Sequence, residues 1–263
     1  MKEVCHSGNG KCAAWLLLEK PFAKNPGALI VRQLEKSAAK SAVSYRSGDD
    51  FVSAYLAQPS RGLRHPAIIL IHEWWGLTDC LKQQAQRYAT QGYVALAVDL
   101  YRGKVGTTPG EARSLMRKLP EERALQDVEA AFAYLTTRPD VDPKRIGSIG
   151  WSMGGGWSIR LAENQPKLAA FVVNYGPLPA NPTLIARIRA PVLGNFGVKD
   201  KGIPPVSVQA FEKVMNNAGK SVDIRIYQAG HGFSNPDQGR GYESEAAQDS
   251  QRQSDAFFER YLK

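Results

Sequence analysis

The sequence alternates short apolar runs with longer stretches of helical periodicity, and this alternation constrains the fold more than any other feature. Apolar runs at 66–71, 93–98 and 146–151 have the length of buried strands, and helical patterns follow them. A strand, a helix and a second strand in succession require a crossover between parallel strands. The sequence therefore predicts an α/β fold, with a mostly parallel sheet of about seven or eight strands and helices on both faces.

The regular pattern begins near residue 41. A β-hairpin is expected around the turn residues 48–50, where alternating apolar and polar positions flank a Gly-Asp-Asp sequence. We predict one domain over 41–263 and a partly irregular N-terminal extension over 1–40. The remaining elements expected in the domain are helices over 78–91, from 120, over 154–163, 205–217 and 244–262, and strands over 168–174, 190–196 and 222–227.

The N-terminal extension contains one short apolar run, residues 13–18, which is too short and too soon followed by charge to be a typical signal peptide. We predict a cytoplasmic protein and leave an exported form open. Cys5 and Cys12, with His6 between them, match no zinc spacing, so no metal site is predicted. With Cys80 they make an odd number of cysteines, and disulfides are not expected to hold the fold together.

The net charge of +9 comes from lysines and arginines that are scattered along the chain. No aromatic and basic residues interleave as in nucleic-acid-binding segments, so no nucleic-acid partner is predicted. No apolar run has the length needed to cross a bilayer, so no membrane partner is predicted. A small-molecule substrate is the expected partner, and the chain is expected to be a monomer or a dimer.

The sharpest local motif is Gly150-Trp151-Ser152-Met153-Gly154, a G-x-S-x-G sequence between a predicted strand and a predicted helix. In a nucleophile elbow the chain turns so tightly that the serine has a strained backbone, and small residues on either side prevent collisions. The helix that follows directs free N–H groups toward a developing oxyanion. This context predicts that Ser152 is a nucleophile.

A serine hydroxyl needs a base, and the base needs a third group that orients it. The fold requires the order nucleophile, acid, histidine. Among the four histidines, His231 lies in a loop beyond the last predicted strand, and Asp200 directly follows the strand over 190–196. We therefore predict the triad Ser152, Asp200 and His231.

A second cluster, His-Glu-Trp-Trp-Gly at 72–76, ends the first parallel strand. Its backbone can complete an oxyanion hole, and Trp74 and Met153 are the predicted N–H donors. Glu73 lies between an apolar strand and two tryptophans, where desolvation would raise the pKa of its carboxyl.

From His72 to the C-terminus the sequence resembles the dienelactone hydrolase family. The resemblance rests on the segments 72–76, 98–101, 150–155 and 229–233, which occur in the family's order. It implies one α/β-hydrolase domain, hydrolysis through an acyl-enzyme, and no cofactor. It also implies that Glu73 contacts the resting nucleophile, and it assigns the triad to the same three residues.

Two positions depart from the family pattern. Most members have cysteine as the nucleophile, whereas this chain has Ser152, which must rely on His231 as a general base. The family's arginines hold a carboxylate on the substrate, but the position four residues after the histidine is Asn235, and Arg102 and Lys104 stand in a shifted register. A broader esterase is therefore predicted rather than an enzyme for dienelactone itself.

The predicted function is that of a serine hydrolase, a carboxylesterase that cleaves small carboxylic esters or lactones. A small peptidase of the same fold and a catalytically idle binding protein remain as alternatives. The side chains that could line the substrate pocket are Trp74, Trp75, Tyr101, Arg102, Trp151 and Phe233. For the aromatic residues among them, ordinary core packing is an equal alternative.

Overall fold

A computed structural model describes residues 38–263 apart from 61, 63 and 180. The expected N-terminal extension therefore lies almost wholly outside the described residues, as do Cys5, His6 and Cys12. The last positions of that extension, from Ala38, already belong to the first strand.

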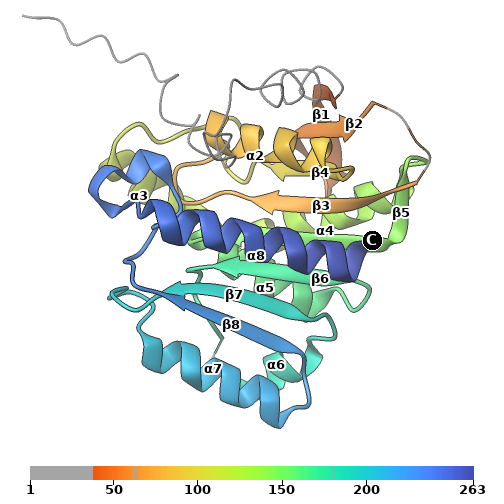
Figure 1. Cartoon of the computed structure of the whole chain (residues 1–263). Helices are drawn as coiled ribbons and strands as arrows, with labels where there is room; N and C mark the ends of the chain where they lie inside the picture. Colours follow the sequence, from red (N-terminus) through yellow and green to blue (C-terminus); the bar gives the residue numbers. More distant parts are fainter. Residues whose placement is uncertain (1–37, 61, 63, 180) are drawn as a thin grey trace, which may run out of the picture.

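The core of the molecule is one sheet of eight strands in the order β1-β2-β4-β3-β5-β6-β7-β8 (Figure 1). The hairpin β1–β2 and the β2–β4 pair are antiparallel, and the five remaining pairs are parallel. The predicted α/β architecture is thus confirmed. The strands are β1 (Ala38–Ser47), β2 (Asp50–Pro59), β3 (His65–Ile71), β4 (Val94–Val98), β5 (Val141–Trp151), β6 (Ala170–Asn174), β7 (Val192–Gly197) and β8 (Val222–Tyr227).

Helices cover both faces of the sheet because its central strands are apolar on both sides. In β3, Ile68 and Leu70 pack into one core cluster, whereas Ile69 and Ile71 pack into the other, and all four are fully buried. The first cluster is covered by α2 (Asp79–Thr90) and α8 (Ser244–Leu262); Figure 1 shows α8 lying across the middle of the sheet. The helices whose buried residues join the second cluster are α4 (Glu121–Thr137), α5 (Met153–Asn164), α6 (Pro182–Arg187) and α7 (Pro205–Asn217). Helix α3 (Pro109–Lys118) packs against this cluster through the partly buried Leu115.

Three details differ from the sequence prediction. The strand expected over 146–151 begins earlier, at Val141. The sequence analysis missed this start because residues 142–145 are partly or fully exposed and interrupt the apolar pattern. The short helix α6 and the 3₁₀ helix η2 (Pro236–Gly241) were not predicted, since elements of one or two turns show too little periodicity.

Cys80, in the first turn of α2, is disulfide-bonded. The sequence analysis, which did not expect disulfides to hold the fold together, did not predict this bond. In the described part of the chain, no helix is both long enough and apolar enough to cross a membrane.

Candidate active site

Ser152 occupies the sharp turn between β5, which ends at Trp151, and α5, which begins at Met153. Its φ of 51° and ψ of −118° lie in a region that residues other than glycine rarely adopt. A Cβ atom on Gly150 would collide with the carbonyl of Gly154, and one on Gly154 would collide with the carbonyl of Ile71. The two glycines of the motif are thus sterically required, as a nucleophile elbow demands.

The three residues predicted from chain order meet at this turn. Ser152 Oγ lies 2.7 Å from His231 Nε2, and His231 Nδ1 lies 2.7 Å from Asp200 Oδ2. The parallel strands β5, β6, β7 and β8 are consecutive neighbours, so the loops after β5, β7 and β8 come together at one edge.

Asp200 is held by the backbone of its own loop. Its Oδ1 accepts hydrogen bonds from the amides of Gly202 (2.8 Å) and Ile203 (3.0 Å), which leaves Oδ2 for the histidine. The side chain is fully buried, whereas that of His231 is 40 % exposed. A carboxylate fixed in this way can orient the imidazole and select its tautomer.

The electrostatics of this pair favour charge on both partners. Burial opposes ionisation of Asp200, but the hydrogen bonds from His231 and the loop amides outweigh it and lower the pKa of this carboxyl. Burial likewise opposes protonation of His231, but the hydrogen bond and the charge of Asp200 outweigh it and raise the pKa of the imidazole. The imidazole is therefore suited to take up a proton.

The two predicted oxyanion donors lie beside the nucleophile. Met153 is the first residue of α5, where backbone N–H groups have no partner within the helix. Trp74 is in the loop after β3, and the pairing of Ile71 with Gly150 brings the end of β3 next to the elbow. Their assignment as donors remains a prediction.

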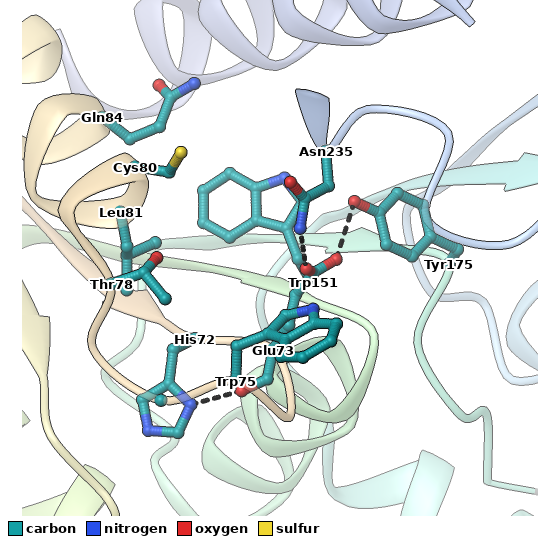
Figure 2. Close-up of a pocket in the computed structure, with 11 residues that line it drawn as sticks. His72, Glu73, Trp75, Thr78, Cys80, Leu81, Gln84, Trp151, Tyr175 and Asn235 are labelled. Carbon is teal, nitrogen blue, oxygen red and sulfur yellow. Dashed lines mark hydrogen bonds between the residues drawn. The ribbon is translucent and has the colours of Figure 1, made fainter. Parts of the chain in front are cut away.

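The carboxyl of Glu73, which the family resemblance places against the resting nucleophile, has two hydrogen-bond donors in this structure. Its Oε1 accepts a hydrogen bond from Tyr175 Oη at 3.1 Å, and its Oε2 accepts one from Asn235 Nδ2 (Figure 2). With both oxygens occupied, the carboxyl is bonded to these neutral donors, while the hydroxyl of Ser152 is bonded to His231. Burial, partly offset by the two donors, raises the pKa of Glu73, in the direction expected from the sequence.

Tyr175 was missed by the sequence analysis. It follows β6 directly, is fully buried, and has a φ of 40°. Its ring lies edge-on to that of His231 with centroids 5.3 Å apart, and its hydroxyl also lies 2.8 Å from Ser234 Oγ. Its position at the carboxyl end of a parallel strand was the only available signal.

The predicted pocket aromatics divide into two groups. Trp75 and Trp151 line a cavity of about 40 Å³ beside Glu73 (Figure 2). Tyr101 is buried, and its hydroxyl lies 3.3 Å from the sulfur of Met153. Phe233 is fully buried between two tyrosine rings, so the structure places it in the core.

Arg102 lies elsewhere and has carboxylate partners within the protein. Its Nη1 and Nη2 donate to the buried carboxylate of Asp127 at 2.7 and 3.0 Å, and its Nε donates to Asp50 at 3.1 Å. Three hydrogen bonds thus hold the guanidinium to two carboxylates of the protein. Arg102 is also not among the residues that line the cleft containing Ser152, so the structure does not place it where the sequence analysis expected a substrate-binding residue.

A second, larger hollow opens onto the nucleophile itself. This cleft of about 490 Å³ contains Ser152 and His231. Apart from Ser152, Met153 and His231, no residue that lines this cleft was predicted as a site residue. Its apolar lining includes Met116 from α3, Trp157 from α5, Leu184 from α6, and Leu178 and Ile203 from loops.

The model of the dienelactone hydrolase family matches residues 52–262, which is most of the chain. The chain belongs to this family. It is therefore a carboxylic ester hydrolase with the α/β-hydrolase fold, as the resemblance of its motifs implied. Among the described residues, no group of His, Cys, Asp and Glu is arranged to hold a metal ion.

Individual family relatives are moderately similar. The "Putative carboxymethylenebutenolidase" of Methylorubrum extorquens is 32 % identical over 228 residues, which cover 81 % of this chain and 78 % of that protein. The crystal structure of a "Putative Dienelactone Hydrolase" from Klebsiella pneumoniae has a TM-score of 0.78 and 27 % identity, over 85 % of this chain and 99 % of its own.

The same fold occurs in a larger enzyme of another activity. The acylaminoacyl peptidase of Pyrococcus horikoshii has a TM-score of 0.71 and 20 % identity, over 91 % of this chain but 44 % of the peptidase chain. At this identity the likeness concerns the fold alone.

Proposed function

We propose that this member of the family is a serine hydrolase that cleaves small carboxylic esters or lactones through an acyl-enzyme on Ser152. The observation that carries the proposal is the continuous chain of short contacts, each 2.7 Å long, from the serine hydroxyl through His231 to Asp200. Such an arrangement is what a serine needs to act as a nucleophile near neutral pH.

In the proposed acylation step, Ser152 Oγ attacks the ester carbonyl while His231 Nε2 takes the hydroxyl proton. Asp200 stabilises the imidazolium that forms, and the raised pKa of His231 favours this proton transfer. The amides of Trp74 and Met153 stabilise the tetrahedral oxyanion. Collapse of this intermediate breaks the ester bond, and the imidazolium gives its proton to the departing alcohol oxygen.

Deacylation repeats these roles with water. His231 takes a proton from a water molecule as the water attacks the acyl carbonyl, and it returns the proton to Ser152 Oγ when the acid leaves. Every step uses side chains and backbone amides of this chain together with water, so the proposed mechanism requires no cofactor.

Two features favour a broad ester substrate over a carboxylate-bearing dienelactone. Asn235 donates to Glu73, and Arg102 is paired with Asp127, so both side chains already have carboxylate partners within the protein. The cleft beside Ser152 is largely apolar and large enough for a substrate body bigger than an acetyl group.

Labelling with a fluorophosphonate probe tests the proposal, since the probe reacts with activated serines. We expect rapid labelling and turnover of p-nitrophenyl acetate in the wild-type protein, and loss of both in Ser152→Ala. Ser244→Ala, at the start of α8, is the matched control and should behave as wild type. Absence of labelling in folded wild-type protein would instead favour the idle binding protein, and faster cleavage of a peptide amide than of the ester would favour the peptidase.

A further inference from the structure

The cleft that contains Ser152 follows one face of helix α5. The residues of that helix that line it include Ser152 at the N-cap, Trp157 near the middle, and Arg160 and Glu163 toward the C-terminal end. Arg160 follows Ser152 by eight positions, which places its Cα about 12 Å along the helix axis from the nucleophile. The cleft thus extends from Ser152 to a charged pair, Arg160 and Glu163, farther along α5.

The charged pair at the far end is incompletely satisfied. Arg160 Nε lies 3.6 Å from Glu163 Oε2, which is too far for a hydrogen bond. Arg160 Nε and both carboxylate oxygens of Glu163 are buried, and none has a hydrogen-bond partner in the described part of the chain. The side chain of Glu163 is 1 % exposed, whereas that of Arg160 is 42 % exposed, so part of the guanidinium remains open to the cleft.

The walls between Ser152 and this pair are apolar. Met116, Trp157, Leu178 and Leu184 line the cleft along its course. A ligand that fills it therefore needs an apolar body, and only its far end reaches Arg160. Arg160 is 42 % exposed, and its pair with Glu163 at 3.6 Å is too long for a hydrogen bond. An acceptor on the ligand could therefore take a hydrogen bond from the exposed part of the guanidinium.

The charges around the pair decide what kind of acceptor fits. Glu163 and Glu121 both line the cleft, so a carboxylate on the ligand would meet two like charges. An ammonium group would meet Arg160, with Arg187 near enough to Glu163 to act on its charge. An uncharged carbonyl or hydroxyl group avoids both conflicts and still accepts from the guanidinium.

From these observations we infer that the preferred substrates are elongated apolar esters that end in an uncharged hydrogen-bond acceptor, and that Arg160 binds this end. The inference rests on the proposed function and specifies its substrate class. Allowing for the reach of the arginine side chain toward the helix N-terminus, about six to eight chain atoms separate the scissile carbonyl from the polar end.

Two ester series test the inference, one with the variable end on the acyl group of p-nitrophenyl esters and one with it on the alcohol of acetate esters. Each series compares terminal carboxamide, methyl, carboxylate and ammonium at equal length. We expect wild type to have the highest kcat/KM for the carboxamide in at least one series. In Arg160→Met the carboxamide-to-methyl ratio in that series should fall by roughly tenfold or more.

Because both esters are measured on the same variant, any loss of folded protein cancels from the ratio. Arg225→Met, which removes an exposed arginine on β8, is the matched control and should leave the ratio unchanged. In Glu163→Gln we expect kcat/KM for the carboxylate-ended ester to rise relative to that for the carboxamide, because a charge of the same sign is removed.

A ratio within twofold of wild type for Arg160→Met in both series would overturn the inference, as would a wild-type preference for the carboxylate end. Turnover of the esters with such ratios would leave the proposed function intact. Absence of all ester turnover, together with absence of fluorophosphonate labelling, would overturn the proposed function and the inference with it.

Discussion

Replacing Arg102 by methionine separates a structural role of this arginine from a substrate-binding role. The guanidinium of Arg102 donates two hydrogen bonds to the carboxylate of Asp127 on α4. The side chain of Asp127 is fully buried. In Arg102→Met that carboxylate retains the hydroxyl of Ser47, at 2.7 Å, as its remaining side-chain donor among the described residues. The variant therefore leaves a buried charge without its counter-ion.

The expected cost follows from that burial. Removing one partner of a buried ion pair typically destabilises a protein by about 3–5 kcal/mol. For a domain of this size each kcal/mol lowers the melting temperature by about 2–4 °C, so Arg102→Met should melt roughly 6–20 °C lower. The double variant Arg102→Met/Asp127→Leu should recover much of this loss, because it also removes the stranded charge.

Urea unfolding gives the free energies, and kcat/KM for neutral and carboxylate-bearing esters gives the selectivity. The control is Arg225→Met, whose pair with Asp223 is about half exposed and should contribute under about 1 kcal/mol. We expect Arg102→Met to unfold more easily while its selectivity between the two esters is unchanged. A free energy of unfolding within about 1 kcal/mol of wild type, with a selective loss on the carboxylate ester, would refute the structural interpretation.

Three further changes test other parts of the site. Gly154→Ala should destabilise the fold by about 1–3 kcal/mol and slow fluorophosphonate labelling, because its methyl group would meet a carbonyl of β3. Gly110→Ala should do neither, because a methyl group there would make only an ordinary contact, at 3.9 Å from Thr108 Oγ1. The value of kcat/KM should fall as pH drops through the pKa of His231, which lies above the ordinary 6.5. Asp200→Asn should move the midpoint of this pH profile to lower pH and reduce kcat/KM by up to about 10⁴-fold. An unmoved midpoint would contradict the role of Asp200. Tyr175→Phe removes a donor to a buried carboxyl and should cost about 1–3 kcal/mol in urea unfolding, and an unchanged value would mean that water replaces the hydroxyl.

The parallel sheet could be predicted from sequence because its strands are continuously apolar. Both faces of β3 and β4 are covered by helices, so nearly every residue in these strands is buried and the pattern is unambiguous. The start of β5 could not be predicted, since residues 142–145 are partly exposed and their pairing irregular. Short elements such as α6 also escape detection, because their position depends on tertiary packing rather than on periodicity.

That Ser152, Asp200 and His231 come together was predictable for a different reason, because each lies in a loop that directly follows a parallel strand. The partners of Glu73 were not predictable in this way. Tyr175 and Asn235 reach it from two separate loops, and nothing in their spacing to residue 73 signals the contact. The binding of Arg102 to Asp127 likewise depends on how α4 packs, which no local pattern encodes.

The strained turn at Ser152 has a consequence for an exchange of its reactive atom. Two glycines and the end of β3 fix the backbone at Ser152. The position of the side-chain atom that follows Cβ is therefore the same whether that atom is oxygen or sulfur. Exchanging the oxygen of residue 152 for sulfur would therefore leave the backbone of the turn as it is. The reactivity of the new atom would then depend on the protonation of the neighbouring imidazole and carboxyl groups rather than on the sheet.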